Sequence, residues 1–235
     1  MAGGACAAPD LISEEQIEFP RRLLEVGEGR VRGAHGPTRP ATARLRRSIF
    51  DRPDVQDALT GPVLDLYAGA GLLGLEALSR GAPHVDFVER HRDACAVIRD
   101  NLQSLACTPR ATLHCRNVER VIEALPPGYS LCFVDPPYPI DATPVLRTLL
   151  RRRLLTLDGM LLWRHPRNRP APEQLTVQPL GSAPGPSDPP SVPIPGDTLS
   201  LVRVDQRRYG DAVLDTYVTA AGRSASPEGG RGVAR

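Results

Sequence analysis

The sequence predicts an α/β fold in which helices alternate with the strands of one doubly wound, mostly parallel, seven-stranded sheet. Short apolar runs alternate with segments of helical periodicity, in the order expected for successive strand–helix–strand units. Two rigid turns stand out, the glycine turn 68–71 after the first strand and Asp135–Tyr138 after a later one. Open α/β sheets bind ligands at the carboxyl ends of their strands, so we expect the functional residues there.

Composition limits the protein classes that remain. The 235 residues suffice for one large domain with tails, and with 41% hydrophobic but 4% aromatic residues the core is expected to be aliphatic. The five cysteines show no C-x-x-C spacing, which favours reduced thiols over a disulfide framework or a zinc site. We find no signal peptide pattern and no apolar run long enough to span a membrane. We therefore expect a cytoplasmic, metal-free protein that is a monomer.

The N-terminal part is dominated by arginine. The chain contains no lysine, so all 29 basic residues are arginines, and they are dense between residues 21 and 52. A helix is predicted from Thr42, as its N-cap, to about Phe50, with Leu45 and Ile49 as its apolar stripe. The arginines around it either form a solvated helix face or bind the phosphates of a polyanion. The candidates for phosphate contacts are Arg39, Arg44, Arg46 and Arg47.

The first strand, its turn and its helix form a nucleotide-binding layout. Val63–Tyr67 is predicted as a strand and Leu72–Arg80 as a helix, with Gly69 and Gly71 in the turn between them. The spacing to Gly74 nearly matches the dinucleotide fingerprint, so a nicotinamide or flavin site has to be considered. Asp65 argues against it, because a carboxylate at this strand end repels a pyrophosphate and attracts a cationic amino acid moiety.

The second strand, His84–Val88, is followed by Glu89, about 20 residues after the glycine turn, where a carboxylate binds ribose hydroxyls. Glu89 also fits a solvent-exposed strand end. A helix over about 92–105 leads to a third strand, Thr112–Cys115, and then to Asn117. Asn117 suits an adenine contact, and it equally suits the N-cap of a helix predicted over Val118–Leu125.

The fourth strand, Leu131–Val134, ends in Asp135, and the two prolines that follow cannot extend it because they have no N–H to donate. A helix over about 144–152, a fifth strand and an antiparallel hairpin complete the sheet. The last three strands are predicted at Gly159–Trp163, Leu199–Arg207 and Ala212–Thr219. Trp163 is expected in the core, whereas Arg164 and His165 at the tip of its strand are candidates to reach a substrate.

The predicted α/β domain covers residues 37–219, with a proline-rich insertion at 170–197. Residues 1–36 are expected to form a partly disordered extension and residues 220–235 a disordered tail.

The chain carries, in this order, a glycine turn, an acidic residue at the end of the second strand and a D-P-P-Y motif. In this it resembles the S-adenosylmethionine-dependent methyltransferases that modify exocyclic amines. The nearest resemblance is to the RsmD family, which methylates the guanine N2 amine of small-subunit (16S) ribosomal RNA. The resemblance covers about residues 37–219 and rests on the matching stretches Arg39–Phe50, Asp65–Ala82, Val88–Glu89 and Phe133–Tyr138. The sequence departs from the family at its N-terminus, at Ala41 and Arg47 and in the insertion. The fold implied is Rossmann-like.

The resemblance implies a role for each site residue. It implies that S-adenosylmethionine is the cofactor, that ribosomal RNA or the small ribosomal subunit is the partner, and that no metal takes part. The implied cofactor residues are Asp65, Tyr67, Gly69, Gly71, Glu89, Arg90 and Asn117, and the implied catalytic residues are Asp135, Pro136, Pro137 and Tyr138. Asp135 and the Pro136 carbonyl would accept the N–H groups of the amine, and Tyr138 would stack on the base. Two alternatives remain, a DNA adenine N6 methyltransferase and a catalytically silent RNA-binding or assembly protein.

Overall fold

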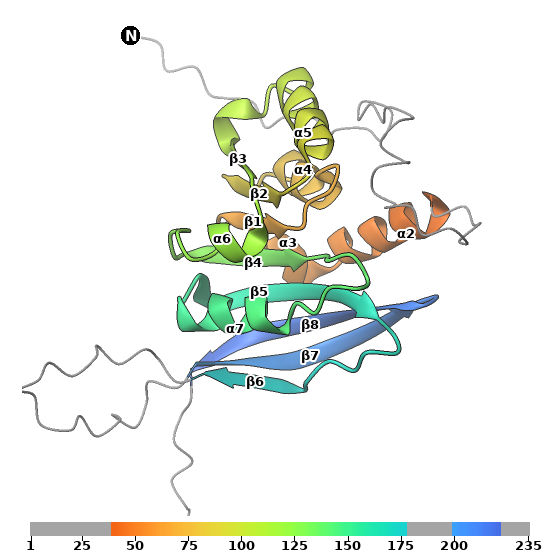
Figure 1. Cartoon of the computed structure of the whole chain (residues 1–235), viewed down its shortest axis with the longest axis vertical. Coiled ribbons are helices and arrows are strands. Elements are labelled where there is room, and N and C mark those ends of the chain that lie inside the picture. The colour runs from red at the N-terminus through yellow and green to blue at the C-terminus, as the bar shows by residue number, and fades with distance from the viewer. Residues whose placement is uncertain (1–38, 178–198, 222–235) are drawn as a thin grey trace, which may run out of the picture.

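The computed structural model describes residues 39–177 and 199–221 (Figure 1). Its helices are α2 (Arg39–Phe50), α3 (Pro53–Ala58), α4 (Leu72–Ser79), α5 (Arg92–Ser104), α6 (Val118–Val121) and α7 (Thr143–Arg151), with a 3-10 turn at Thr108–Arg110. Its strands are β1 (Val63–Leu66), β2 (Val85–Glu89), β3 (Ala111–Cys115), β4 (Tyr129–Val134), β5 (Leu155–Pro166), β6 (Gln174–Val177), β7 (Leu199–Tyr209) and β8 (Ala212–Ala221). The N-terminal extension, most of the insertion and the tail that the sequence predicts lie outside these residues.

The eight strands form one sheet in the order β3-β2-β1-β4-β5-β8-β7-β6. The first five are parallel, and β8, β7 and β6 join them in antiparallel pairs. The chain runs outward from β1 to β3 and then returns to place β4 on the other side of β1. The strand order therefore reverses between β1 and β4, and this is the point at which doubly wound sheets bind ligands.

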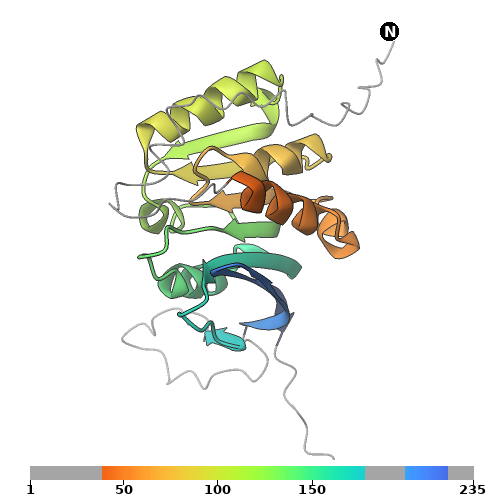
Figure 2. The same cartoon turned by 90° about the vertical axis from the view of Figure 1, so that its right-hand side faces the viewer.

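Helices cover both faces of the sheet (Figure 2). Apolar residues of α2, α3, α4 and α5 pack on one face, and those of α6 and α7 pack on the other. The predicted stripe of α2 is confirmed, because Leu45 and Ile49 are buried on the first face. Phe50 at the end of α2 lies 5.7 Å from Phe133 of β4, measured between ring centroids, and so fixes this helix against the central strands.

The predicted fold class is confirmed, with eight strands instead of seven. The additional strand, β6, lies inside the range expected for the proline-rich insertion. Its two inward residues, Leu175 and Val177, are too few among the prolines to give a strand pattern. Helix α3 was not predicted, although Pro53 at its start is a recognised helix-initiating position. Helix α2 begins at Arg39, before the predicted cap, because Pro40 is tolerated in a first turn. Helix α6 ends at Val121, four residues earlier than predicted.

Gly74 determines how closely α4 approaches the sheet. A Cβ atom at this position would lie 2.2 Å from Cε1 of Phe87 and 2.9 Å from Cγ1 of Val85, both on β2. Phe87 is fully buried and has no space to move away. The third glycine of the G-x-G-x-x-G spacing thus serves the packing of helix on strand.

We expect Gly74→Ala to lower the free energy of unfolding by about 1–2 kcal/mol, because overpacking outweighs the gain in helix propensity. Urea unfolding measures this change. Phe87→Leu removes the clashing ring, so the double variant should lose less stability than the sum of the two single variants. Additive losses would show that the close approach of Gly74 to Phe87 is not the cause.

Candidate functional site

The candidate site lies at the carboxyl ends of β1, β2 and β4. Asp65 is the third residue of β1, Glu89 the last of β2, and Asp135 the first residue after β4. The parallel register aligns Leu66 with Val134, and the Asp135 N–H donates to the Leu66 carbonyl at 3.3 Å. The sheet therefore brings together the three carboxylates that the sequence singled out.

The turn after β1 needs left-handed backbone at alternate residues. Tyr67 has a φ of +58°, Gly69 of +56° and Gly71 of +78°. A Cβ atom on Gly69 would meet nothing within 4 Å, so this side of the turn is open to a ligand. On Gly71 a Cβ atom would lie 2.9 Å from Cγ1 of Ile98, so the missing side chain allows close packing against α5, and the implied contact of Gly71 with the cofactor stays a prediction.

Asp65 is a buried carboxylate at the base of this turn, with 1% of its surface exposed. Its Oδ2 accepts the Gly74 N–H at 2.9 Å, which joins β1 to the first turn of α4. Burial raises the pKa of Asp65 to about 7, and the negative charges of Asp135 and Glu89 also raise it. The hydrogen bond from Gly74 lowers the pKa but does not outweigh these effects. A cation placed beside Asp65 would stabilise its ionised form.

Glu89 is also buried, and backbone groups hold both of its oxygens. Oε2 accepts the Gly69 N–H at 2.9 Å and Oε1 accepts the His91 N–H at 2.8 Å. These bonds fix the carboxylate between the glycine turn and the start of α5. Each oxygen has a second lone pair, so binding of a ribose hydroxyl remains compatible with this geometry and stays a prediction.

The other predicted cofactor residues surround the mouth of the turn. The Tyr67 hydroxyl donates to Glu119 of α6 at 3.1 Å, and this contact links the turn to the α6 side of the site. Burial, reinforced by the Glu119 charge, raises the pKa of Tyr67. Arg90 is exposed beside Glu89. Asn117 occupies the N-cap position of α6, but its side chain makes no capping hydrogen bond and is exposed.

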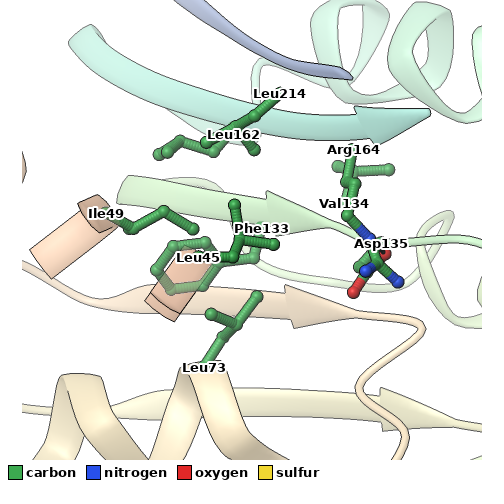
Figure 3. A pocket seen from close by; sticks show the side chains of 9 residues that line it. All are labelled: Leu45, Ile49, Leu73, Phe133, Val134, Asp135, Leu162, Arg164 and Leu214. Atoms are coloured by element: carbon green, nitrogen blue, oxygen red, sulfur yellow. Dashed lines mark hydrogen bonds and ion pairs between the residues drawn. The ribbon is translucent and has the colours of Figure 1, made fainter. Parts of the chain in front are cut away.

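Asp135 forms an ion pair with Arg164 of β5. The Arg164 Nε lies 2.5 Å from Asp135 Oδ1, and Figure 3 shows Arg164 reaching from β5 to the end of β4. Burial raises the pKa of Asp135, and the Arg164 guanidinium opposes this effect. The side chains of Leu45, Ile49, Leu73, Phe133, Leu162 and Leu214 line a small apolar pocket beside the pair.

The residues after Asp135 form a braced loop. Pro136 is buried and Pro137 is exposed, while half of the Tyr138 surface (50%) is exposed to solvent. The Ile140 N–H donates to the Pro137 carbonyl at 2.8 Å, which closes a turn around Tyr138. Arg169, in the connection after β5, donates to the Ile140 carbonyl at 2.8 Å. This brace was not predicted from the sequence, because it joins residues 29 positions apart and depends on tertiary structure.

The arginines of α2 do not form one surface. Arg46, predicted to contact RNA, is 7% exposed, and its Nε lies 3.6 Å from Glu76 of α4. This prediction was wrong for Arg46, because the residue after Leu45 lies on the buried side of the helix. Arg47 is exposed and remains a candidate. Arg39 and Arg44 belong to α2, but their side chains lie outside the described part of the structure.

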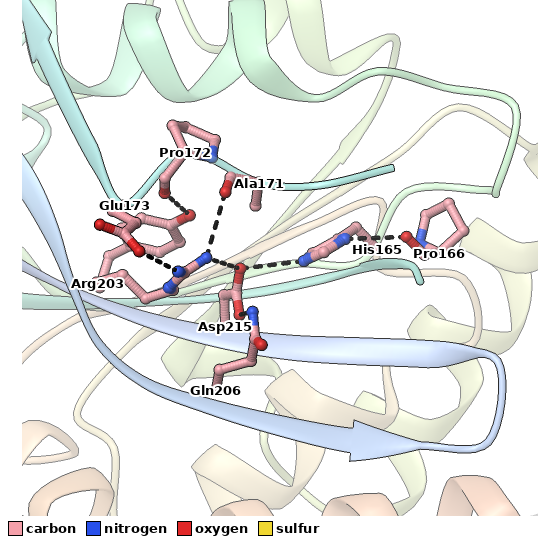
Figure 4. Close-up of polar contacts among 9 residues, drawn as sticks. His165, Pro166, Ala171, Pro172, Glu173, Arg203, Gln206 and Asp215 are labelled. Carbon is pink, nitrogen blue, oxygen red and sulfur yellow. Dashed lines mark hydrogen bonds and ion pairs between the residues drawn. The ribbon is translucent and has the colours of Figure 1, made fainter. Parts of the chain in front are cut away.

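His165 was a candidate to reach a substrate, and it is instead part of the sheet's interior. Its exposed fraction is 3%, and its Nε2 lies 3.1 Å from Asp215 Oδ2 of β8 (Figure 4). Gln206 and Arg203 of β7 donate to the same carboxylate, at 2.8 and 3.4 Å. Burial opposes the charge of Asp215, but the hydrogen bonds from His165 and Gln206 outweigh it and lower its pKa. Trp163, predicted as core, is buried as expected.

Two further findings concern the described residues as a whole. Within 39–177 and 199–221, no cluster of three or more His, Cys, Asp or Glu side chains is arranged to hold a metal ion. In the same ranges, no helix is long and apolar enough to cross a membrane.

Comparison with known proteins places this geometry in context. A family model described as "Conserved hypothetical protein 95" matches residues 27–179. YlbH of Bacillus subtilis is 36% identical over 146 residues, which cover 58% of this chain and 76% of that protein. Ribosomal RNA small subunit methyltransferase D of Escherichia coli is 33% identical over 102 residues, which cover 43% of this chain and half (50%) of that protein. A solved structure of a conserved hypothetical protein from Streptococcus pyogenes has a TM-score of 0.54 and 28% identity, covering 67% of this chain and 86% of that one.

The raised pKa of Asp65 predicts a pH-dependent stability. Between about pH 4 and pH 7 the folded protein keeps a proton that the unfolded chain loses, so the free energy of unfolding falls as the pH rises through about 7. Asp65→Asn keeps an acceptor for the Gly74 N–H and removes this titration. We expect the variant to gain about 2–3 kcal/mol relative to the native protein between pH 5 and pH 8. Parallel stability curves for the two proteins, measured by urea unfolding, would contradict a buried, raised Asp65.

Proposed function

Because the chain belongs to the family described as "Conserved hypothetical protein 95", the RsmD family, we propose that it methylates the exocyclic N2 amine of a guanine in small-subunit ribosomal RNA, with S-adenosylmethionine as methyl donor. The observation that carries the proposal is the position of Asp135, held by Arg164 at the strand-order reversal beside the glycine turn. The name of the Escherichia coli relative, ribosomal RNA small subunit methyltransferase D, supports the choice of RNA.

The residues at the turn fit this methyl donor. S-adenosylmethionine carries an ammonium group, a sulfonium group and a ribose diol. The pKa of Asp65 is raised by burial and by two neighbouring carboxylates, so a nearby cation such as the ammonium group would stabilise its ionised form. Glu89 has free lone pairs that can accept hydrogen bonds from the ribose hydroxyls. A pyrophosphate brought to the same three carboxylates meets repulsion, which argues against a dinucleotide. We assign Gly69 to the open side of the turn and Tyr67, Arg90 and Asn117 to its rim.

The chemical task is to make a poor nucleophile react. The lone pair of an exocyclic amine is delocalised into the base, whereas the bound donor supplies a methyl group that is already activated on a sulfonium. Asp135, through Oδ2, and the Pro136 carbonyl each accept one N–H of the amine, so the nitrogen becomes pyramidal with its lone pair free. Both acceptors bind more strongly as positive charge develops on the nitrogen, which is preferential stabilisation of the transition state.

Tyr138 and the arginines position the RNA. The half-exposed Tyr138 ring stacks on the base that leaves its helix and keeps the amine within near-attack distance, roughly 3–3.5 Å from the methyl carbon. The N-terminal end of α2 lies on the same side of the sheet as the carboxyl ends of β4 and β5 (Figure 1). Arg39 and Arg44, in the N-terminal half of α2, are therefore assigned to phosphate contacts, together with the exposed Arg47 of its last turn. Such contacts position the RNA but do not select a sequence.

Replacing Asp135 tests the mechanism. Asp135→Ala is expected to lower kcat at least 100-fold and to leave the affinity for S-adenosylhomocysteine within a few fold, because the carboxylate is assigned to the amine. Calorimetry measures the affinity, and transfer of labelled methyl measures kcat. A matched control is Asp141→Ala in the same loop, whose carboxylate accepts hydrogen bonds from the backbone N–H and the side chain of Thr143 and is not assigned to the substrate. Full activity of the Asp135 variant would remove this residue from the mechanism.

The product identifies the substrate. Labelled S-adenosylmethionine is offered to small ribosomal subunits and RNA that lack the modification, with total DNA in parallel, and the methylated nucleoside is identified by mass spectrometry. N2-methylguanosine is the expected product. Methyladenine in DNA would replace the proposal with a DNA methyltransferase, and cofactor binding without transfer to either would replace it with a silent RNA-binding protein.

A further inference from the structure

Arg164 has more hydrogen-bonding capacity than the ion pair uses. A guanidinium has five N–H donors, and here Nε is directed to Asp135 Oδ1. Among the described residues, Arg164 donates a hydrogen bond to one side chain, that of Asp135. The neighbouring pocket walls, from Leu45, Leu162 and Leu214, are apolar and offer no side-chain acceptor.

The position of Arg164 relative to the site is fixed by strand register. Trp163 of β5 pairs with Val134 of β4, so Arg164 stands beside Asp135, one step beyond the last pair. The next residue pair, Arg164 with Leu214 of β8, holds the backbone on the other side. About a third of each side chain remains exposed, 31% for Arg164 and 27% for Asp135, so a ligand that reaches one also reaches the other.

We propose that Asp135 and Arg164 together recognise one edge of the substrate, an amine bonded to a carbon that also carries an acceptor ring nitrogen. This inference rests on the proposed function and adds a substrate-contacting residue to it. In guanine the edge is N2–C2–N3: Asp135 Oδ2 accepts an N–H of N2 while an Nη of Arg164 donates to N3. The two contacts are complementary, acceptor to donor and donor to acceptor, and they lock the base in one orientation.

The pair also defines the substrate class. A protonated aliphatic amine offers no acceptor to Arg164 and is repelled by its charge, so amines of protein side chains are disfavoured. A donor at N3 withdraws electron density from the amine, which Asp135 counteracts by accepting its N–H. Arg164 therefore contributes through binding and orientation of the base, and its loss should appear mainly in KM and in selectivity.

The decisive comparison uses an altered base. Small-subunit RNA is assembled by splinted ligation with guanine or 3-deazaguanine, which has C–H in place of N3, at the position that becomes methylated. For the native protein we expect kcat/KM to be about 10- to 100-fold lower on the deaza substrate, the loss that corresponds to one hydrogen bond from a charged donor. For Arg164→Gln we expect the two substrates to differ by less than about threefold, because the donor to N3 is gone.

A second readout separates contact from structure. Removing Arg164 takes away the charge that opposes the burial of Asp135, so the pKa of Asp135 rises and the acid limb of the kcat/KM profile moves to higher pH. The other ionisable groups near the pair are Asp65, Glu89 and Tyr138, and none of them is substituted in this comparison. Arg164→Lys keeps the charge, and we expect its acid limb to stay near that of the native protein.

Arg147→Gln, on the exposed side of α7, is the matched control and should keep the native deaza effect and pH profile. If Arg164→Gln does not fold, as judged by its unfolding curve, the deaza comparison on the native protein and on Arg164→Lys still decides the question. Equal kcat/KM of the native protein on both substrates, or an undiminished deaza effect in Arg164→Gln, would overturn the inference. Either result leaves the proposed function intact, since guanine is methylated in both cases.

Discussion

Three carboxylates at adjoining strand ends are the constraint on which this structure depends. Asp65, Glu89 and Asp135 come from β1, β2 and β4, and parallel pairing in register places them at one edge. Charges of one sign in a partly desolvated site are unfavourable. Burial is the main cause of the raised pKa of Asp65, and the like charges of Asp135 and Glu89 add to it. The fold limits this cost locally: backbone N–H groups bind Asp65 and Glu89, and Arg164 binds Asp135.

The antiparallel strands of the sheet help to hold in place the arginine that pairs with Asp135. β5 supplies Arg164, and it is held between β4 and β8. On the opposite face, the buried Asp215 collects hydrogen bonds from His165, Gln206 and Arg203, which tie β5, β7 and β8 together (Figure 4). Removing one partner from such a cluster leaves a buried charge uncompensated. The cluster thus keeps rigid the strand that presents Arg164, because His165 is the next residue of β5.

Much of the fold and of the site was predictable because local patterns carry it. The glycine turn, the strand-ending prolines and the alternation of strands and helices place Asp65, Glu89 and Asp135 without tertiary information. The errors concern burial and pairing. Arg46 and His165 are polar and were assigned to the surface, but Glu76 and Asp215, distant in sequence, hold them inside. The pairing of Arg164 with Asp135 follows only from the register of β4 against β5.

The arginine content illustrates why composition alone does not locate a nucleic-acid interface. In a chain whose 29 basic residues are all arginine, the same side chain performs different tasks. Arg46 and Arg52 are buried ion-pair partners, Arg169 braces the loop that carries Tyr138, and Arg203 supports Asp215. Arg164 differs from these, because its carboxylate partner is itself assigned to the substrate and because Asp135 is its one side-chain hydrogen-bond partner among the described residues. A structural arginine finds acceptors in the fold for most of its guanidinium donors. An arginine that is available to a ligand keeps donors for which the fold provides no acceptor.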